Sequence, residues 1–370
     1  MKKLVFLLIF ISINIVFVEA QEWKIAKGIK DTNLKAIAAD KENSDVIYIG
    51  SRFIYKTENS GEDWQKVWTL PAMAKVNFLL AEGKTVYAAT EKGLFKSDDD
   101  GENWQRIFRE IDEENNILCL DWDRQNNLLY IGTQDGLFRN RDNGNWQKSK
   151  GKLGNAEIYG IKISPENADA IYVISNEGFF KTDNRGKNWK RTFIISKIAE
   201  EEEQEETNQQ MNRLNDLVIA QKAIYLTGRD ILLKSEDKGE TWQEMSKEVL
   251  EGADIRSIVV FGNRIFLGTD RGVFKRRVKG IGKRVKGEEI EKKEQEGEEE
   301  NGEGWEEIYV GLSSLDIQKV ILAGDDLWAI TGKGLFKLQV AGYRLQVKDE
   351  EENKILEEKD KEVNIEQQIF

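Results

Sequence analysis

Apolar and polar positions alternate in seven short runs along the chain, and each run reads as two strands joined by a polar loop. Alternation with a period of two, in runs rich in β-branched and aromatic residues, is typical of half-buried β-strands. The runs are Ile47–Lys56, Val86–Lys96, Leu129–Arg139, Ile171–Lys181, Ile224–Lys234, Ile265–Lys275 and Leu327–Lys337. Successive runs mostly lie about forty residues apart, the length expected of one four-stranded propeller blade.

Five copies of one polar phrase follow these runs, and each copy ends in tryptophan. Its form is Ser/Thr-x-Asp-x-Gly-x-x-Trp, relaxed at some copies. The copies are Thr57–Trp64, Ser97–Trp104, Asn140–Trp146, Thr182–Trp189 and Ser235–Trp242. Each Trp begins a further strand, and an apolar stretch such as Lys35–Ala39 or Ile117–Leu120 follows it. Four strands in each of seven repeats predict an all-β fold, a single seven-bladed β-propeller of four-stranded blades.

The two ends of the repeat region predict how the ring closes. The last repeat, Ile317–Val340, has no Trp strand after it, whereas Glu22–Ala26 is a Trp strand with no partner before it. Pairing the two removes both exposed sheet edges, which otherwise invite aggregation. We therefore expect the N-terminal strand to complete the final blade.

The residue types of the phrase favour a structural turn. An Asp can accept backbone N–H bonds from its own turn, a Gly can take a positive φ, and a Trp folded over the turn buries a large apolar face. A sugar-stacking platform is the functional alternative. The residues concerned are Gly61, Trp64, Asp99, Gly101, Trp104, Asp142, Gly144, Trp146, Gly186, Trp189, Asp237, Gly239 and Trp242.

The phrase resembles the Asp-box (BNR) repeat of sialidases, xyloglucanase-type glycosidases, sortilin-type receptors and photosystem II assembly and stability factors. Ser164–Thr182 is similar to the sortilin and xyloglucanase version. The resemblance runs from about Glu22 to Val340 and implies a propeller. These relatives perform different functions, so it does not imply one activity.

Three segments flank or interrupt the repeats. Residues 1–20 have the pattern of a cleaved secretion signal, with a basic start, an apolar stretch at Leu4–Val18 and small residues near Ala20. An uncleaved anchor is the alternative. The propeller then spans 21–340, with charged insertions at 197–213 and 276–303, and a charged tail at 341–370 that reads as disordered or loosely helical. We expect an exported protein, periplasmic or extracellular, that is a monomer.

Composition removes several kinds of chemistry. The chain has no His, which excludes Ser-His-Asp and Cys-His catalysis and the usual zinc sites. Its one cysteine, Cys119, lies in an apolar run and cannot form an internal disulfide. The unbroken Glu run at Ala199–Glu206 lacks the converging geometry of a calcium site. The net charge of −12 disfavours a nucleic-acid partner. We expect no metal and no cofactor.

The loops that enter the inner strands share one face of a propeller with the loops that join the second and third strands. This loop face is the default place for a ligand. Its candidate binding residues are Arg52, Arg109, Arg229, Arg256, Arg271 and Trp68. Carboxylates expected beside them are Glu91, Asp135, Glu177, Asp230 and Asp270. Four aromatics placed four residues after a blade Trp either pack between blades or form a rim patch; they are Trp68, Phe108, Phe193 and Tyr309.

Two main classes of function remain open, beside a carbohydrate-binding propeller and a purely structural surface protein. A non-catalytic propeller would bind a protein or peptide on its loop face; the resemblance to assembly factors implies a partly assembled membrane protein, and a cell-surface component is the other possibility. A glycoside hydrolase would need either a sialidase's three arginines and Tyr–Glu pair or two carboxylates about 6.5–9.5 Å apart. The sialidase Arg-Ile-Pro signature is missing, since the only prolines are Pro71 and Pro165. The sequence therefore favours the binding protein.

Overall fold

We analysed a computed structural model, which describes residues 22–29, 31, 33–140, 144–193, 214–245, 250, 252–278 and 304–340. The predicted signal at 1–20, the insertion at 197–213, nearly all of the insertion at 276–303, the tail at 341–370 and Asp142 lie outside these residues. Within the described part, no helix has the length and apolar character needed to cross a membrane.

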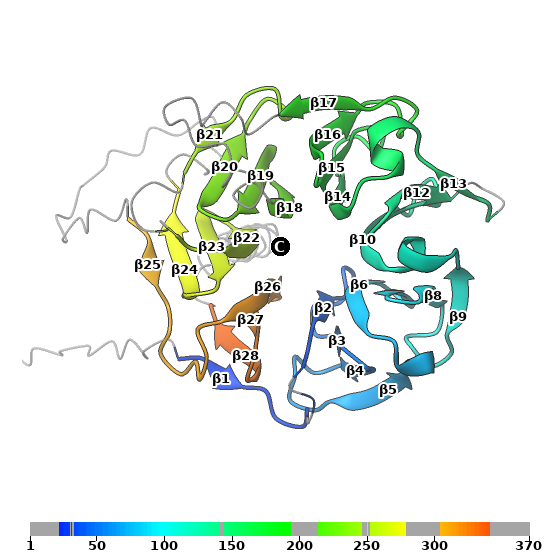
Figure 1. Ribbon diagram of the computed structural model, residues 1–370. Helices are drawn as coiled ribbons and strands as arrows, with labels where there is room; N and C mark the ends of the chain where they lie inside the picture. Colours follow the sequence, from blue (N-terminus) through cyan, green and yellow to red (C-terminus); the bar gives the residue numbers. More distant parts are fainter. Residues whose placement is uncertain are drawn as a thin grey trace, which may run out of the picture.

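Seven four-stranded antiparallel sheets stand around a central axis as blades (Figure 1). The inner strands are β2 (Ala36–Ala39), β6 (Val76–Glu82), β10 (Ile117–Asp123), β14 (Ile158–Ile163), β18 (Leu214–Ala220), β22 (Ile255–Phe261) and β26 (Ile317–Ala323). The second strands are β3 (Ile47–Gly50), β7 (Thr85–Thr90), β11 (Leu128–Thr133), β15 (Ile171–Ser175), β19 (Ala223–Gly228), β23 (Arg264–Thr269) and β27 (Asp326–Thr331).

The third strands are β4 (Phe53–Thr57), β8 (Gly93–Ser97), β12 (Gly136–Asn140), β16 (Gly178–Thr182), β20 (Ile231–Ser235), β24 (Gly272–Arg277) and β28 (Gly334–Gln339). The outer strands are β5 (Gln65–Thr69), β9 (Gln105–Phe108), β13 (Trp146–Lys148), β17 (Lys190–Phe193), β21 (Gln243–Glu244), β25 (Glu306–Glu307) and β1 (Lys24–Ile25). We number the blades 1 to 7 from β2 to β28. The predicted all-β, seven-bladed architecture is confirmed.

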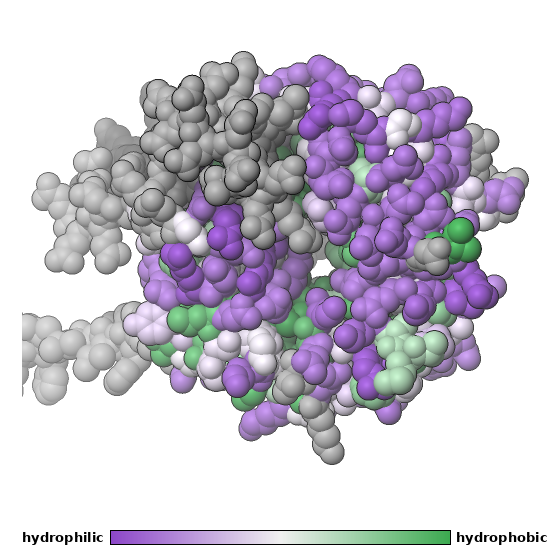
Figure 2. Space-filling view, in the orientation of Figure 1, coloured by the Kyte–Doolittle hydropathy of each residue, from purple (hydrophilic) through white to green (hydrophobic). Residues whose placement is uncertain are grey.

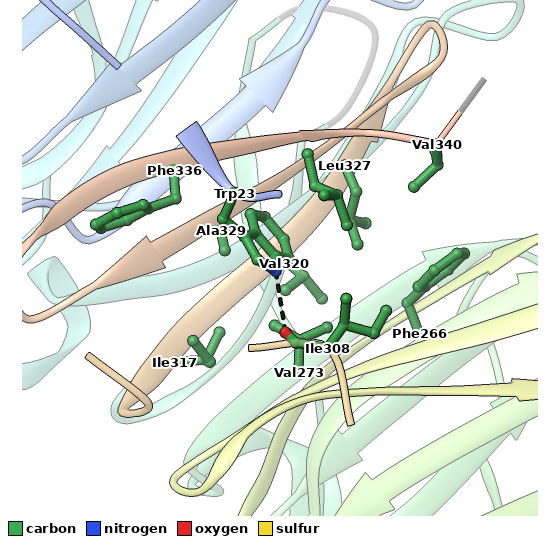
Figure 3. Packing of buried hydrophobic residues seen from close by; sticks show 11 residues of the cluster. Trp23, Phe266, Val273, Ile308, Ile317, Val320, Leu327, Ala329, Phe336 and Val340 are labelled. Carbon is green, nitrogen blue, oxygen red and sulfur yellow. Dashed lines mark hydrogen bonds between the residues drawn. The ribbon is translucent and has the colours of Figure 1, made fainter. Parts of the chain in front are cut away.

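The N-terminal strand closes the ring, as the sequence predicted. β1 pairs antiparallel with β28, with Lys24 opposite Lys337 and Ile25 opposite Phe336. Trp23, just before β1, is 2% exposed, and its indole Nε1–H donates to the Ile308 carbonyl at 3.0 Å. Figure 3 shows this side chain between the strands of blades 6 and 7. Blade 7 is therefore assembled from both ends of the repeat region.

The hydrophobic core is divided among the junctions between blades. Each of seven buried clusters combines residues of two neighbouring blades; blades 1 and 2, for example, share Tyr48, Ile54, Leu79 and Phe95. Burial of each large apolar side chain favours folding by about 1.5–3 kcal/mol. The alternating strand pattern therefore stabilises the ring mainly at the contacts between blades.

Candidate functional site

The topology gathers two sets of connections on one face. In each blade the turn between the second and third strands lies beside the start of an inner strand, as when the Val76 amide donates to the Ser51 carbonyl at 2.8 Å. The connections that lead from an outer strand to the next inner strand reach the same face. Three of them contain short 3₁₀ helices, η1 (Pro71–Met73), η2 (Asp112–Asn115) and η3 (Gly151–Gly154). These connections and turns form the loop face, seen from the front in Figure 2.

Arg256 is the most firmly held of the candidate arginines. Its Nε donates to Asp254 at 3.0 Å, and its Nη1 donates to Asp316 at 2.6 Å and to the Ile317 carbonyl at 3.2 Å. Burial disfavours its charge, but the hydrogen bonds to Asp316 and Asp254 raise the pKa of Arg256 overall. Because blade 6 supplies Arg256 and Ile317 begins the inner strand of blade 7, this side chain joins two blades at the loop face.

The other four candidate arginines are exposed on the same face. Arg52, Arg229 and Arg271 lie in turns between second and third strands, and Arg109 follows β9. The guanidinium of Arg52 lies 5.9 Å from the ring centre of Phe53, within the range of a cation–π contact. The arginines are spread over blades 1, 2, 5 and 6, so they form separate points of positive charge rather than one cluster.

The expected carboxylates also lie in these turns, and several already have partners. Lys148 binds Glu114 at 2.6 Å and Asp135 at 3.2 Å, and Lys152 binds Glu177 at 3.1 Å. Burial disfavours the Lys148 charge, yet its hydrogen bonds to the two carboxylates raise its pKa. Asp270 accepts the backbone N–H of Asp254 at 2.9 Å. Glu91 and Asp230 lie in the corresponding turns of blades 2 and 5.

Exposed apolar side chains on the loop face are a feature that sequence reasoning indicated only at Tyr309 and otherwise missed. Met73 is 68% exposed, Ile111 73% and Leu315 42%, and each lies in a connection from an outer strand to the next inner strand. Tyr309 and Val310, in the same connection as Leu315, are more than half exposed. Figure 2 shows green areas at the β5–β6 and β9–β10 connections, within a mostly purple face. The only signal in the sequence was an apolar residue outside the alternating runs.

The four aromatics that follow a blade Trp do not behave alike. Trp68 stacks on Trp104 of the next blade, with ring centres 4.6 Å apart. Phe108 is 2% exposed and meets Trp146 edge to face at 4.9 Å. These two pack between blades, whereas Tyr309 is 54% exposed and belongs to the apolar part of the loop face. Phe193 is the last residue of β17.

Acidic side chains on the inner strands form hydrogen bonds and an ion pair at the edge of the central channel. Asp216 accepts the amides of Leu217 at 3.0 Å and Ile258 at 3.2 Å, and forms an ion pair with Lys319 at 2.9 Å. Asp121 accepts the amide of Ile163 in the next blade at 2.8 Å. Inner strands have one unpaired edge, and these carboxylates satisfy its N–H groups. A small opening remains at the centre of the ring (Figure 2).

The Trp-ending turns lie on the opposite face and have a repeated internal geometry. In blade 2, the Asp99 carboxylate accepts the Ser97 hydroxyl at 2.8 Å and the Asn103 amide at 2.8 Å, while the Gly101 amide donates to Ser97 at 2.9 Å. The Asn103 and Ser97 hydrogen bonds lower the pKa of Asp99 to about 2. In blade 5, hydrogen bonds from Thr241 and then from Ser235 hold the pKa of Asp237 well below its usual range.

Each turn also contacts the preceding blade. The turn glycines Gly61, Gly101, Gly144, Gly186 and Gly239 all have positive φ. A Cβ added at Gly61 would overlap the indole of Trp328, and one at Gly239 would lie 2.7 Å from Cε1 of Phe179. Trp104 closes its own turn, because its Nε1–H donates to the Gly101 carbonyl at 2.8 Å. Trp64, Trp146, Trp189 and Trp242 occupy the same place at the ends of their turns.

Cys119 is buried in the core between blades 3 and 4. Burial raises the pKa of its thiol to about 12, so the thiol is protonated at neutral pH. Among the described residues, no group of three or more His, Cys, Asp or Glu side chains is placed to hold a metal ion.

The fold is similar to that of solved propellers of different function. The extracellular domain of a one-component system from B. thetaiotaomicron has a TM-score of 0.64 at 14% identity, covering 86% of this chain and 40% of that one. YCF48 bound to a D1 peptide has a TM-score of 0.63 at 13% identity, covering 88% and 98%. An ancestral GH74 enzyme has a TM-score of 0.62 at 16% identity, covering 86% and 46%.

No protein-family model and no curated protein matches the sequence. This chain spans less than half of the length of the one-component system domain and of the GH74 enzyme, but nearly all of YCF48. Identities this low support the propeller fold alone. They do not decide between a binding protein and an enzyme.

Proposed function

We propose that this chain is an exported, non-catalytic propeller of the Asp-box type that binds a protein or peptide through its loop face. The observation that carries the proposal is the exposure of Met73, Ile111, Tyr309 and Leu315 on the face that also holds the exposed arginines. Met, Tyr and Arg are enriched in protein interfaces relative to the rest of a protein surface. Contiguous apolar patches rimmed by polar residues mark interaction sites on a protein surface.

Two comparisons support this reading. YCF48, a single propeller of similar extent, is known in complex with a D1 peptide. The domain from B. thetaiotaomicron is extracellular, in agreement with the secretion signal expected at residues 1–20. A peptide or an exposed segment of a membrane-associated protein would meet the apolar side chains first, and the arginines would select acidic or carbonyl-rich neighbours.

A glycoside hydrolase is the second candidate, because a GH74 enzyme shares the fold. Such an enzyme needs two carboxylates free to act as acid and base, one of them with a raised pKa. The described carboxyl groups with a perturbed pKa, Glu58, Asp99, Asp237 and Glu240, are all shifted downward. The inner-strand carboxylates Asp121 and Asp216 are bonded to backbone amides. These observations favour the binding protein.

The test compares capture of a binding partner with hydrolysis of a glycan. Wild-type protein, the loop-face variant Met73→Ser/Ile111→Ser/Leu315→Ser and the rim control Ile25→Ser are each used to capture partners from the envelope fraction of the source cells. Ile25 is 55% exposed on the outer strand β1, not in a connection between blades, so it controls for loss of an exposed apolar side chain. We expect a partner retained by wild type and the control and lost from the loop-face variant. Hydrolysis of xyloglucan or a sialoside, abolished by one carboxylate substitution, would instead establish the enzyme.

A further inference from the structure

A groove of about 700 Å³ lies between blades 3 and 4, and none of the candidate arginines or exposed apolar residues of the loop face lines it. It runs across the rim of the disc, from the η3 connection on the loop face to the turn at Gly186–Trp189 on the opposite face. Trp189, which is half-buried, lines it, and the nearly buried Tyr130 and Phe180 form its floor. Blade 3 forms one wall with β12 and β13, and blade 4 forms the other with β16 and β17.

The charge of the groove is opposite to that of the chain as a whole. Six of the fifteen residues that line it are basic and none is acidic, in a protein of net charge −12. Three of the six already have partners: Lys148 binds Glu114 and Asp135, Lys152 binds Glu177, and Arg139 donates to Gln147 at 3.3 Å and to the Arg185 carbonyl. The groove is thus a patch of positive charge on a protein whose net negative charge repels acidic ligands elsewhere.

The other three basic residues are Lys150, Lys187 and Arg191. All three are exposed, and no carboxylate of the described residues lies within ion-pair distance of them. Neighbouring Lys190, by contrast, pairs with Glu240 at 3.2 Å. Three cations along one groove, without an ion-pair partner among the described residues, attract a ligand that carries several negative charges in a row.

The outer strands identify the kind of ligand. β13 and β17 are the outermost strands of their blades, and no described strand pairs with their outer edges. An extended peptide can add to such an edge through its own backbone groups while its side chains reach alternate pockets. A nucleic acid has no matching backbone donors, and the overall negative charge disfavours its long phosphate chain.

We propose that the groove between blades 3 and 4 binds an extended acidic peptide segment, with Lys150, Lys187 and Arg191 pairing its carboxylates. Trp189, which is half-buried, contacts the aliphatic parts of the peptide, and the buried Tyr130 and Phe180 support it from below. This second binding surface is tested separately from the loop face, because the variants of the two surfaces share no substituted residue.

The experiment is a fluorescence-anisotropy titration of the full chain with a labelled octaglutamate peptide at low salt. The groove variant is Lys150→Glu/Lys187→Glu/Arg191→Glu. The matched control, Lys24→Glu/Lys84→Glu/Lys222→Glu, makes the same change in net charge at exposed lysines outside the groove. We expect the groove variant to bind at least tenfold more weakly than wild type, the control to bind within about twofold of wild type, and the affinity to fall with added salt.

The chain has its own acidic run at Ala199–Glu206, so the titration is repeated with its six glutamates changed to Gln. The proposal is supported if the wild-type chain or the glutamine-substituted chain binds the peptide and the groove substitutions abolish that binding. Absence of binding in both proteins overturns it, as does equal binding by the groove variant. An octathymidylate that binds as tightly, with the same loss in the groove variant, overturns the assignment of a peptide. Circular dichroism of each variant checks that the blades are intact.

Discussion

The hydroxyl of Tyr48 in blade 1 donates a hydrogen bond to the backbone carbonyl of Asp100 in the turn of blade 2, at 3.0 Å. Tyr130 makes the same bond to Arg185 at 3.1 Å, from blade 3 to blade 4. In other pairs a lysine of the third strand replaces the tyrosine, as when Lys337 donates to Ser60 at 3.1 Å. The acceptors Ser60, Asp100 and Arg185 all have positive φ, so the turn presents this carbonyl to the preceding blade.

Removal of this bond should weaken the ring measurably. Tyr48→Phe leaves the Asp100 carbonyl without its donor, and we expect a loss of about 1 kcal/mol in the free energy of unfolding, measured by urea titration. Tyr225→Phe is the control, because the Tyr225 hydroxyl is buried and has no partner among the described residues. That change should be neutral or slightly stabilising. Equal losses in the two variants would contradict an interblade role for the Tyr48 bond.

Alanine substitutions at two turn glycines distinguish the cost of backbone strain from the cost of overpacking. Gly239 and Gly144 have φ of +81° and +78°, but only Gly239 has a neighbour, Phe179, within 4 Å of an added Cβ. We expect Gly144→Ala to cost about 1–2 kcal/mol through its left-handed backbone. Gly239→Ala should cost about 1–3 kcal/mol more, because the methyl group overpacks against the preceding blade. Urea midpoints that match in the two variants would show that the turn does not pack on Phe179.

Acid stability should depend on the turn aspartates. The pKa of Asp99 is lowered from 3.8 to about 2, so the unfolded chain takes up the proton first as the pH falls. The contribution of this carboxylate is therefore fully present above about pH 4 and is lost between about pH 4 and pH 2. Asp99→Asn/Asp237→Asn should flatten the decline of the urea midpoint in that window.

Asparagine is a suitable replacement because it already occupies the same position in blades 1 and 4. The Asn59 side chain accepts the Asp63 amide at 3.0 Å, and Asn184 accepts the Asn188 amide at 2.9 Å. The double variant should therefore keep its turns at pH 7. An unchanged acid profile would mean that other groups dominate acid unfolding.

Ring closure should depend on Trp23. Trp23→Ala removes a side chain that is 2% exposed and its hydrogen bond to Ile308, and we expect a cost of about 3–5 kcal/mol. Lys24→Ala alters an exposed side chain of the same strand and should change the unfolding free energy by less than about 0.5 kcal/mol. Thermal unfolding followed by tryptophan fluorescence measures both. A small effect of Trp23→Ala would mean that blade 7 is stable without its outer strand.

The architecture could be predicted from the sequence because it depends on local patterns. The alternation in Val86–Lys96 gives strands β7 and β8, and the unpaired Trp strand at Glu22–Ala26 gives the closure. The site could not be predicted as fully. Trp68 and Tyr309 hold the same position in their repeats, yet Trp68 packs on Trp104 and Tyr309 is 54% exposed. Which of them is covered depends on the neighbouring blade.

Pairing between residues far apart in the sequence is the second reason why the site could not be fully predicted. Arg256 was expected to be a loop-face residue available to a ligand, but its guanidinium is bound to Asp254 and Asp316, the latter sixty positions away along the chain. No local sequence pattern predicts such a partner. Exposed Met73 and Ile111 were missed for a related reason, since an apolar residue in a loop is buried or exposed according to the packing of that loop.

The most direct test of the loop-face proposal places a photoreactive amino acid at Ile111 and, separately, at Ile25. Both are exposed isoleucines, 73% and 55%; Ile111 lies in the β9–β10 connection and Ile25 in the outer strand β1. After irradiation in the source cells, we expect one discrete crosslinked protein or peptide from position 111 and none from position 25. Equal adducts from both positions, or none from position 111, would contradict a binding surface on the loop face.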